Sequence, residues 1–169
     1  MFVFHYFFSA SFFNLLNFRF TQLHYVWFSF EIKEVGENFR ILYPLYLHGG
    51  KYIKIGKNFD SSLRLRLEAF DEHLGHKFTP KITIGDNVSI NSDCHIGAIN
   101  EIIIEDGVLI ASKVFITDHY HGEISNEAIN ISPSERKLYS KGAVKIEKNV
   151  WIGEGVVILP NVTIGENCI

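Results

Sequence analysis

A chain of 169 residues is the length of one domain, and an apolar content of 47% supplies a substantial core. The net charge of −3 excludes the basic excess of a nucleic-acid-binding protein and the acidic run of a disordered tail. Cys94 and Cys168 form neither a CxxC pair nor a zinc-type cluster with His, so we expect no disulfide framework, no metal, and a reducing, cytoplasmic setting.

Residues 1–30 are rich in aromatic side chains and lie outside the repeat described below. No Lys, Arg, Asp or Glu occurs in residues 1–18, so the basic region of a secretory signal is missing. Polar residues interrupt the run of about 20 apolar residues that a membrane-spanning helix needs. Apolar residues recur at roughly helical spacing and predict an amphipathic helix. We expect this segment either to pack on the body or a partner subunit, or to make a peripheral membrane contact.

Residues 31–169 contain a repeated unit with an aliphatic residue at its centre, Gly or Glu next, and Asn or Gly two positions later. The six central residues are separated by 20, 29, 20, 42 and 18 positions; they are Val35, Ile55, Ile84, Ile104, Ile146 and Ile164. A finer period of six is visible, for example at Ile84, Ile90 and Ile96. Three sixes equal the shortest separation, so the pattern predicts a triangular coil of three short strands whose aliphatic side chains stack from coil to coil.

An antiparallel β-sandwich would instead show apolar–polar alternation between loops of varied length. The Gly that often follows the central residue, as at Gly85, predicts a sharp backbone bend at that position. The two longest separations predict insertions, one of eleven residues within residues 68–80 and one of 24 that begins just after Ile116. A small bulge is expected at Gly49 and Gly50. Long excursions from a rigid solenoid are where function is usually located.

The repeat resembles that of the hexapeptide-repeat acyltransferase superfamily, within it most closely the galactoside and maltose O-acetyltransferases and the capsular or lipopolysaccharide O-acetyltransferases. The resemblance runs over residues 82–169 and is carried by residues 84–91, residues 108–119 and the stretch Asn-Val-Trp-Ile-Gly at 149–153. It implies an all-β fold, a left-handed parallel β-helix with an inserted long loop, although β-α-β-type crossovers are otherwise right-handed. It also implies a homotrimer with active sites between subunits.

The same resemblance implies transfer of an acetyl group from acetyl-CoA to a sugar hydroxyl, in surface polysaccharide biosynthesis. The family continues for further coils and then a cap, so we expect the β-helix domain of residues 31–169 to be truncated at its C-terminus.

Site residues follow from the match, position by position. His119, at the start of the long loop, matches the catalytic base, and an imidazole with a pKa of about 6.5 is mostly neutral at pH 7. Asn91 matches an acceptor-binding residue, and His121 is the competing histidine, expected in substrate binding. Trp151 and Gly153 match positions beside the bound CoA.

Plainer interpretations of these residues remain open. Asn91 could be a corner residue that tolerates a left-handed turn, and Trp151 could pack on the surface. Asp118 could orient the imidazole, but neighbours in an extended chain rarely face each other, so we expect it to form a turn.

Two other function classes share this architecture. A structural, non-catalytic β-helix would have no use for the loop and its His. A zinc enzyme of the γ-carbonic-anhydrase type would need three His ligands, and His95, His119 and His121 do not reproduce that spacing.

Overall fold

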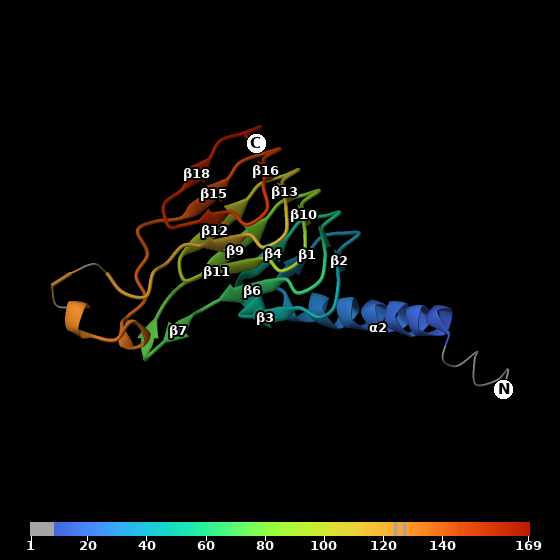
Figure 1. Ribbon diagram of the computed structural model, residues 1–169, viewed down its shortest axis with the longest axis horizontal. Helices are drawn as coiled ribbons and strands as arrows, with labels where there is room; N and C mark the ends of the chain where they lie inside the picture. Colours follow the sequence, from blue (N-terminus) through green and yellow to red (C-terminus); the bar gives the residue numbers. More distant parts are fainter. Residues whose placement is uncertain (1–8, 124, 127) are drawn as a thin grey trace.

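The computed structural model describes residues 9–123, 125–126 and 128–169 as a parallel β-helix with a helix across its first coils (Figure 1). Sheet A consists of β1 (Glu34–Val35), β4 (Ile53–Ile55), β9 (Lys81–Ile84), β12 (Glu101–Ile104), β15 (Val144–Ile146) and β18 (Thr163–Ile164). Sheet B consists of β2 (Arg40–Ile41), β5 (Asp60–Ser61), β10 (Ser89–Ile90), β13 (Leu109–Ile110) and β16 (Trp151–Ile152). Sheet C consists of β3 (Tyr46–His48), β6 (Arg66–Ala69), β11 (His95–Ala98), β14 (Phe115–Thr117) and β17 (Val157–Ile158).

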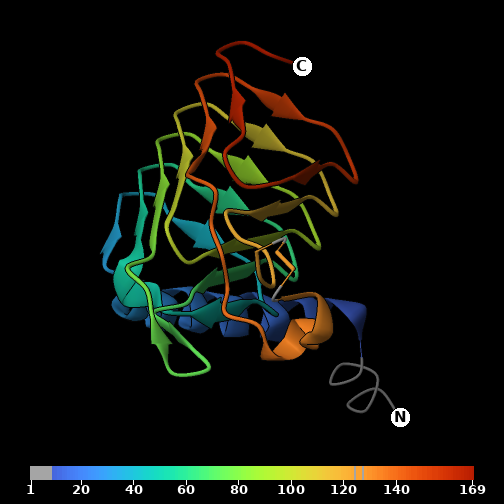
Figure 2. The same cartoon turned by 90° about the vertical axis from the view of Figure 1, so that its left-hand side faces the viewer.

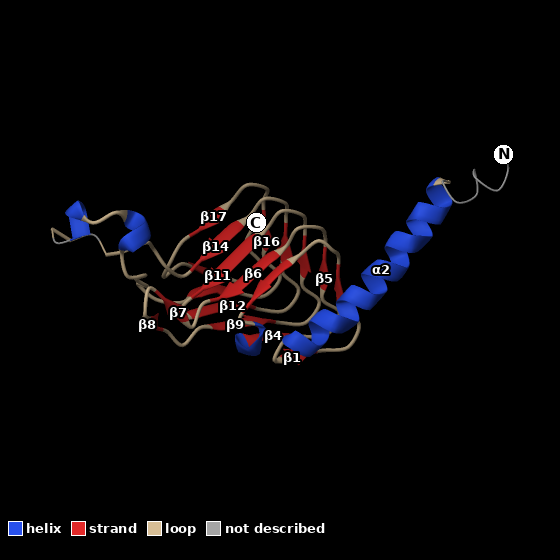
Figure 3. Cartoon of the chain, turned by 90° about the horizontal axis from the view of Figure 1, so that it is seen from below, coloured by secondary structure: helices blue, strands red, loops and turns tan. Residues whose placement is uncertain are grey.

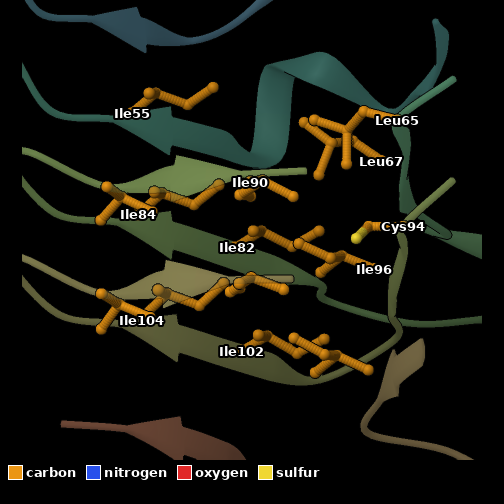
Figure 4. Close-up of a cluster of buried hydrophobic side chains, with 14 of the residues drawn as sticks. Ile55, Leu65, Leu67, Ile82, Ile84, Ile90, Cys94, Ile96, Ile102 and Ile104 are labelled. Atoms are coloured by element: carbon orange, nitrogen blue, oxygen red, sulfur yellow. The ribbon is translucent and has the colours of Figure 1, made fainter. Parts of the chain in front are cut away.

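The predicted columns of aliphatic side chains fill the interior of the coil (Figure 4). In sheet A, Ile84 pairs in register with Ile55 on one side and Ile104 on the other, and all three are buried. In sheet C, Ile96 pairs with Leu67 in the same way, also buried. Each coil buries its apolar side chains only by stacking on its neighbours, so the six-residue phase and the triangular coil are confirmed.

The left-handed turns lie three residues after the central aliphatic residue, where Asn usually stands. Asn38, Asn58 and Asn87 all have φ near +57°, and the side-chain amide of each of the first two donates to the next at 2.9 Å. The bend expected at Gly85 is therefore misplaced by two residues. Gly85 is needed for another reason, because a Cβ there would lie 2.8 Å from the backbone nitrogen of Asp106 in the next coil.

Asn58 offers a test of this turn chemistry. Asn58→Ala should lower the free energy of unfolding by about 1–2 kcal/mol, because a Cβ without a polar group disfavours the left-handed conformation and the amide ladder is cut on both sides. Asn58→Gly cuts the same ladder without the backbone strain, so it should be the more stable of the two variants in urea unfolding. Equal stability of the two variants would show that backbone strain has no part in the turn.

Two insertions leave the coils on the same side, which is the left in Figure 1 and faces the viewer in Figure 2. The first is the antiparallel hairpin of β7 (Glu72–His73) and β8 (His76–Lys77), within residues 68–80 as expected. The second runs from β14 to β15 and contains the short helices η2 (Ala128–Asn130) and η3 (Pro133–Glu135). Near Gly49, where a bulge was expected, the chain turns through a left-handed residue into η1 (Gly50–Tyr52).

Helix α2 (Ala10–Glu31) occupies most of the aromatic segment and projects obliquely from the coils (Figure 3). The Ser9 side chain caps its first turn by accepting from the backbone N–H of Phe12. Its second half is anchored through the buried Phe28 and through Phe20 and His24, whose rings lie against Tyr43. Among the side chains that the structure describes in this helix, eight large apolar ones are exposed: Phe13, Leu15, Leu16, Phe20, Leu23, Val26, Trp27 and Phe30. No helix among the described residues is long and apolar enough to cross a bilayer, and the predicted partner or membrane contact stays a prediction. The expectation for residues 1–8 lies outside the described residues.

Candidate active site

A cavity of about 430 Å³ lies on the outer face of sheet C, beneath the two insertions. Because successive residues of a strand point to opposite faces, Glu68, Gly97 and Thr117 form one row of its floor, while Leu67 and Ile96 point into the core. The hairpin contributes His73, and the long loop contributes Leu138. The volume falls in the range of about 300–1,000 Å³ usual for small-molecule sites.

His119 lies in this cavity with its Nδ1 held on two sides. Nδ1 is 3.0 Å from Oδ1 of Asp118 and 3.1 Å from Oγ1 of Thr117, and the His119 side chain is only 11% exposed. Asp118 is fully buried and accepts hydrogen bonds from the backbone N–H groups of Ile99 and Asn100, at 2.9 and 2.7 Å. The imidazole is therefore fixed by a carboxylate that is itself fixed to the preceding coil.

This arrangement selects the tautomer of His119. The oxygens of Asp118 already accept from two backbone N–H groups and act as acceptors, so Nδ1 of His119 carries a proton and donates it. Nε2 then carries the lone pair, and within the described part of the chain it has no hydrogen-bond partner. An oriented imidazole with a free Nε2 in a cavity can accept a proton from a bound hydroxyl.

The prediction that Asp118 only forms a turn does not describe its whole role. β14 ends at Thr117, so the chain is not extended at 118–119 and the two neighbouring side chains can meet. Asp118 thus orients the catalytic candidate as well as bracing the adjacent coil.

A second polar cluster occupies the same floor. Glu68 is only 2% exposed, and its Oε1 accepts a hydrogen bond from Arg66 Nη2 at 3.0 Å. Its Oε2 lies 2.6 Å from Nε2 of His95 and forms an ion pair with Nε of Arg66 at 2.6 Å. Burial alone would raise the pKa of the Glu68 carboxyl, but the hydrogen bonds from His95 and Arg66 outweigh it and hold that pKa below its ordinary value. Glu68 is therefore ionised at neutral pH.

The structure separates the predicted site residues into two groups. His119 and His121 line the cavity, where the His121 ring lies 6.1 Å from that of His73. Asn91, Trp151 and Gly153 do not line it, because they lie on or just after strands of sheet B, whereas the cavity rests on sheet C. Trp151 is 49% exposed.

Sequence reasoning did not assign Glu68 to the site, and it weighed His95 only as a zinc ligand. The repeat phase contains the signal, since the step of 29 residues that relates Ile55 to Ile84 also places His95 beside Arg66 and Gly97 beside Glu68. No group of three or more His, Cys, Asp or Glu side chains among the described residues is arranged to hold a metal ion.

Comparison with known proteins relates the chain to transferases. The model of the bacterial transferase hexapeptide (six repeats) matches residues 143–169. WbbJ of Escherichia coli, named as a lipopolysaccharide biosynthesis O-acetyl transferase, is 40% identical over 137 residues that cover 78% of this chain and 66% of WbbJ. Galactoside O-acetyltransferase of Escherichia coli is 32% identical over 136 residues, covering 80% of this chain and 49% of that enzyme. The chain thus spans 49% to 66% of the length of these relatives.

Among solved structures, a variant of AntD, an N-acyltransferase from Bacillus cereus in complex with dTDP and coenzyme A, superimposes with a TM-score of 0.66 at 25% identity. The match covers 81% of this chain and 68% of AntD. The six-residue repeat, the stacked coils and these similarities together show that the chain belongs to the hexapeptide-repeat acyltransferase superfamily and folds as its left-handed parallel β-helix.

Proposed function

We propose that the chain transfers an acetyl group from acetyl-CoA to a sugar hydroxyl, with His119 as the general base, in the synthesis of a surface polysaccharide. The observation that carries the proposal is the pairing of His119 Nδ1 with the buried Asp118, which leaves Nε2 free in the cavity. The names of WbbJ and galactoside O-acetyltransferase support a sugar hydroxyl as the acceptor, and the coenzyme A in the AntD structure supports a CoA thioester as the donor.

The reaction then follows from ordinary acyl-transfer chemistry. Nε2 of His119 takes the hydroxyl proton as the oxygen attacks the thioester carbonyl carbon, forming a tetrahedral intermediate. The carbon–sulfur bond breaks, and the imidazolium returns its proton to the leaving thiolate of CoA. Asp118 stabilises the transient imidazolium through Nδ1, as a triad carboxylate does.

The donor side of the site is proposed to come from sheet B of a neighbouring copy. Gly153 has no left-handed φ, and a Cβ added there would meet nothing within 4 Å in the chain. Neither the backbone conformation nor packing in the chain therefore requires glycine at this position. A glycine beside the exposed Trp151 fits a surface on which the pantetheine arm of acetyl-CoA lies close to the backbone.

Gly153→Ala should separate donor binding from folding. The melting temperature should stay unchanged, because the added methyl group meets open space. The KM for acetyl-CoA should rise by about tenfold while the KM for the acceptor holds, measured by thiol release. Gly165→Ala is the matched control, since it follows the central residue of the repeat on sheet A and should alter neither constant. A Gly153→Ala enzyme with unchanged acetyl-CoA kinetics would remove Gly153 from the donor site.

A trimer with shared sites predicts complementation between inactive variants. His119→Ala and Trp151→Ala are mixed in equal amounts under conditions that exchange subunits. In a random mixture, about one quarter of the interfaces join an intact His119 to a neighbour's intact Trp151. The mixture should therefore regain up to about one quarter of the wild-type activity. Analytical ultracentrifugation of the wild type should show a trimer. A monomer at micromolar concentration, or a mixture no more active than its components, would contradict the shared site.

A further inference from the structure

The cluster of Glu68, Arg66 and His95 has no role in the proton transfer assigned to His119, yet it lies in the same cavity. Its carboxylate is as deeply buried as the core, on a strand whose other buried residues, Leu67 and Ala69, are apolar. A buried charge is costly unless its hydrogen bonds are well satisfied, so its hydrogen-bonding capacity is informative.

Glu68 has acceptor capacity to spare. A carboxylate offers about four lone-pair positions, and the hydrogen bonds within the cluster use one on Oε1 and one on Oε2, beside which Arg66 Nε forms an ion pair. His95 donates its Nε2–H to Glu68, and its Nδ1 has no hydrogen-bond partner among the described residues. The cluster therefore presents acceptors to a ligand that donates hydrogen bonds.

Gly97 places this cluster opposite the proposed base. A Cβ built on Gly97 would lie 3.4 Å from Nε2 of His95 and 3.7 Å from Cε1 of His119. The imidazole rings of His95 and His119 thus lie on either side of Gly97, where the cavity floor has no side chain. One small molecule resting on Gly97 can contact both rings at once.

The Glu68 carboxylate disfavours an anionic group at this point. Among the described residues that line the cavity, Arg66 is the only Lys or Arg, and its guanidinium is engaged by Glu68. A phosphate or carboxylate would meet the Glu68 carboxylate with no free cation to offset the repulsion. A neutral hydroxyl, by contrast, donates to a carboxylate in a strong charge-assisted hydrogen bond.

We propose that Glu68, held in place by Arg66 and His95, determines acceptor specificity by accepting a hydrogen bond from a sugar hydroxyl next to the one that His119 deprotonates. The cavity then recognises a neutral diol of the acceptor sugar across Gly97. This inference rests on the proposed function, and its test must therefore separate a wrong subsite from a wrong reaction.

The kinetic test pairs Glu68→Gln with single-hydroxyl deletions of the acceptor. The probes are the methyl glycosides of galactose, glucose, mannose and rhamnose and the monodeoxy analogues of the best of them, at saturating acetyl-CoA. Removing the recognised hydroxyl, or making Glu68→Gln, should each lower kcat/KM by about 10- to 100-fold, mainly through the acceptor KM. Both changes together should cost little more than either alone. If the reductions in kcat/KM caused by Glu68→Gln and by the hydroxyl deletion multiply for every analogue, the proposed contact between Glu68 and the acceptor is wrong.

Two further variants serve as controls for the kinetic test. Glu101→Gln removes a carboxylate that pairs with Lys81 on sheet A, outside the cavity, and should leave the preference among analogues unchanged. His95→Gln leaves the Glu68–Arg66 pair intact, so it serves where Glu68→Gln fails to fold, and it should weaken the same preference to a smaller degree.

A binding measurement makes the subsite testable without turnover. Histidine-selective ¹⁵N NMR with a saturating methyl glycoside should shift the ring signals of His95 in the wild type and in His119→Ala, but not in Glu68→Gln. A His95 shift without any acetyl transfer would keep the subsite and overturn the proposed reaction. Acetyl transfer without a His95 shift would overturn the subsite and keep the reaction.

Discussion

His119→Ala should lower kcat for acceptor acetylation by about 10²- to 10⁴-fold, the usual contribution of a positioned general base. The imidazole contacts Asp118 and Thr117 through Nδ1 and leaves only Nε2 for the substrate, so its loss removes the proton acceptor and little else of the cavity. Acetyl-CoA binding should be nearly unchanged, because the proposed donor surface lies on sheet B. The assay is thiol release from acetyl-CoA with a methyl glycoside acceptor, alongside a binding titration of the donor.

His121→Ala is the matched control for this variant. It lines the same cavity and contacts the His73 ring, but it makes no hydrogen bond to Asp118. It should therefore lose much less activity than His119→Ala. If His121→Ala proves to be the inactive variant, the base is misassigned although the reaction stands. A wild type with neither thiol release nor CoA binding would favour a structural role for the β-helix.

Asp118→Ala should lower both stability and activity. The backbone N–H groups of Ile99 and Asn100 lose their acceptors at the edge of the preceding coil, where unsatisfied donors cost about 1–3 kcal/mol each. We expect the free energy of unfolding to fall by about 3 kcal/mol, measured in urea. Asp118→Asn keeps the volume but places an amide NH₂ against one of these N–H groups, so it should also be destabilised.

The activity of Asp118→Asn reports on the imidazole itself. With the acceptor at Nδ1 weakened, the ring loses its fixed tautomer and kcat should fall by about 10²-fold in the fraction that remains folded. Asp86→Asn is the control, since Asp86 accepts a backbone N–H from Lys57 at an exposed turn and lies away from the cavity. Wild-type stability together with wild-type kcat in Asp118→Asn would refute both roles of Asp118.

Much of this protein could be predicted from the sequence, because the repeat is local and periodic. The six-residue phase through Ile84, Ile90 and Ile96 predicts the coil, and breaks in that phase predict both insertions. His119 could be singled out because it opens the longer insertion and because its position matches the catalytic base of the family that the chain resembles. The positions of the left-handed turns could not be predicted as well. The repeat contains both Gly85 and Asn87, and only the backbone geometry shows that Asn87 takes the left-handed conformation.

The composition of the site depended on the tertiary structure. Asp118 reaches His119 only because the chain bends after β14, and it reaches Ile99 and Asn100 only because coils stack. Glu68 and His95 are 27 residues apart and meet across parallel strands, while His73 arrives on a hairpin that has no repeat. Periodicity specifies which side chains enter the apolar column, because that column repeats in every coil. The outer face does not repeat, so its hydrogen bonds were decided by which strands and loops folding brought together.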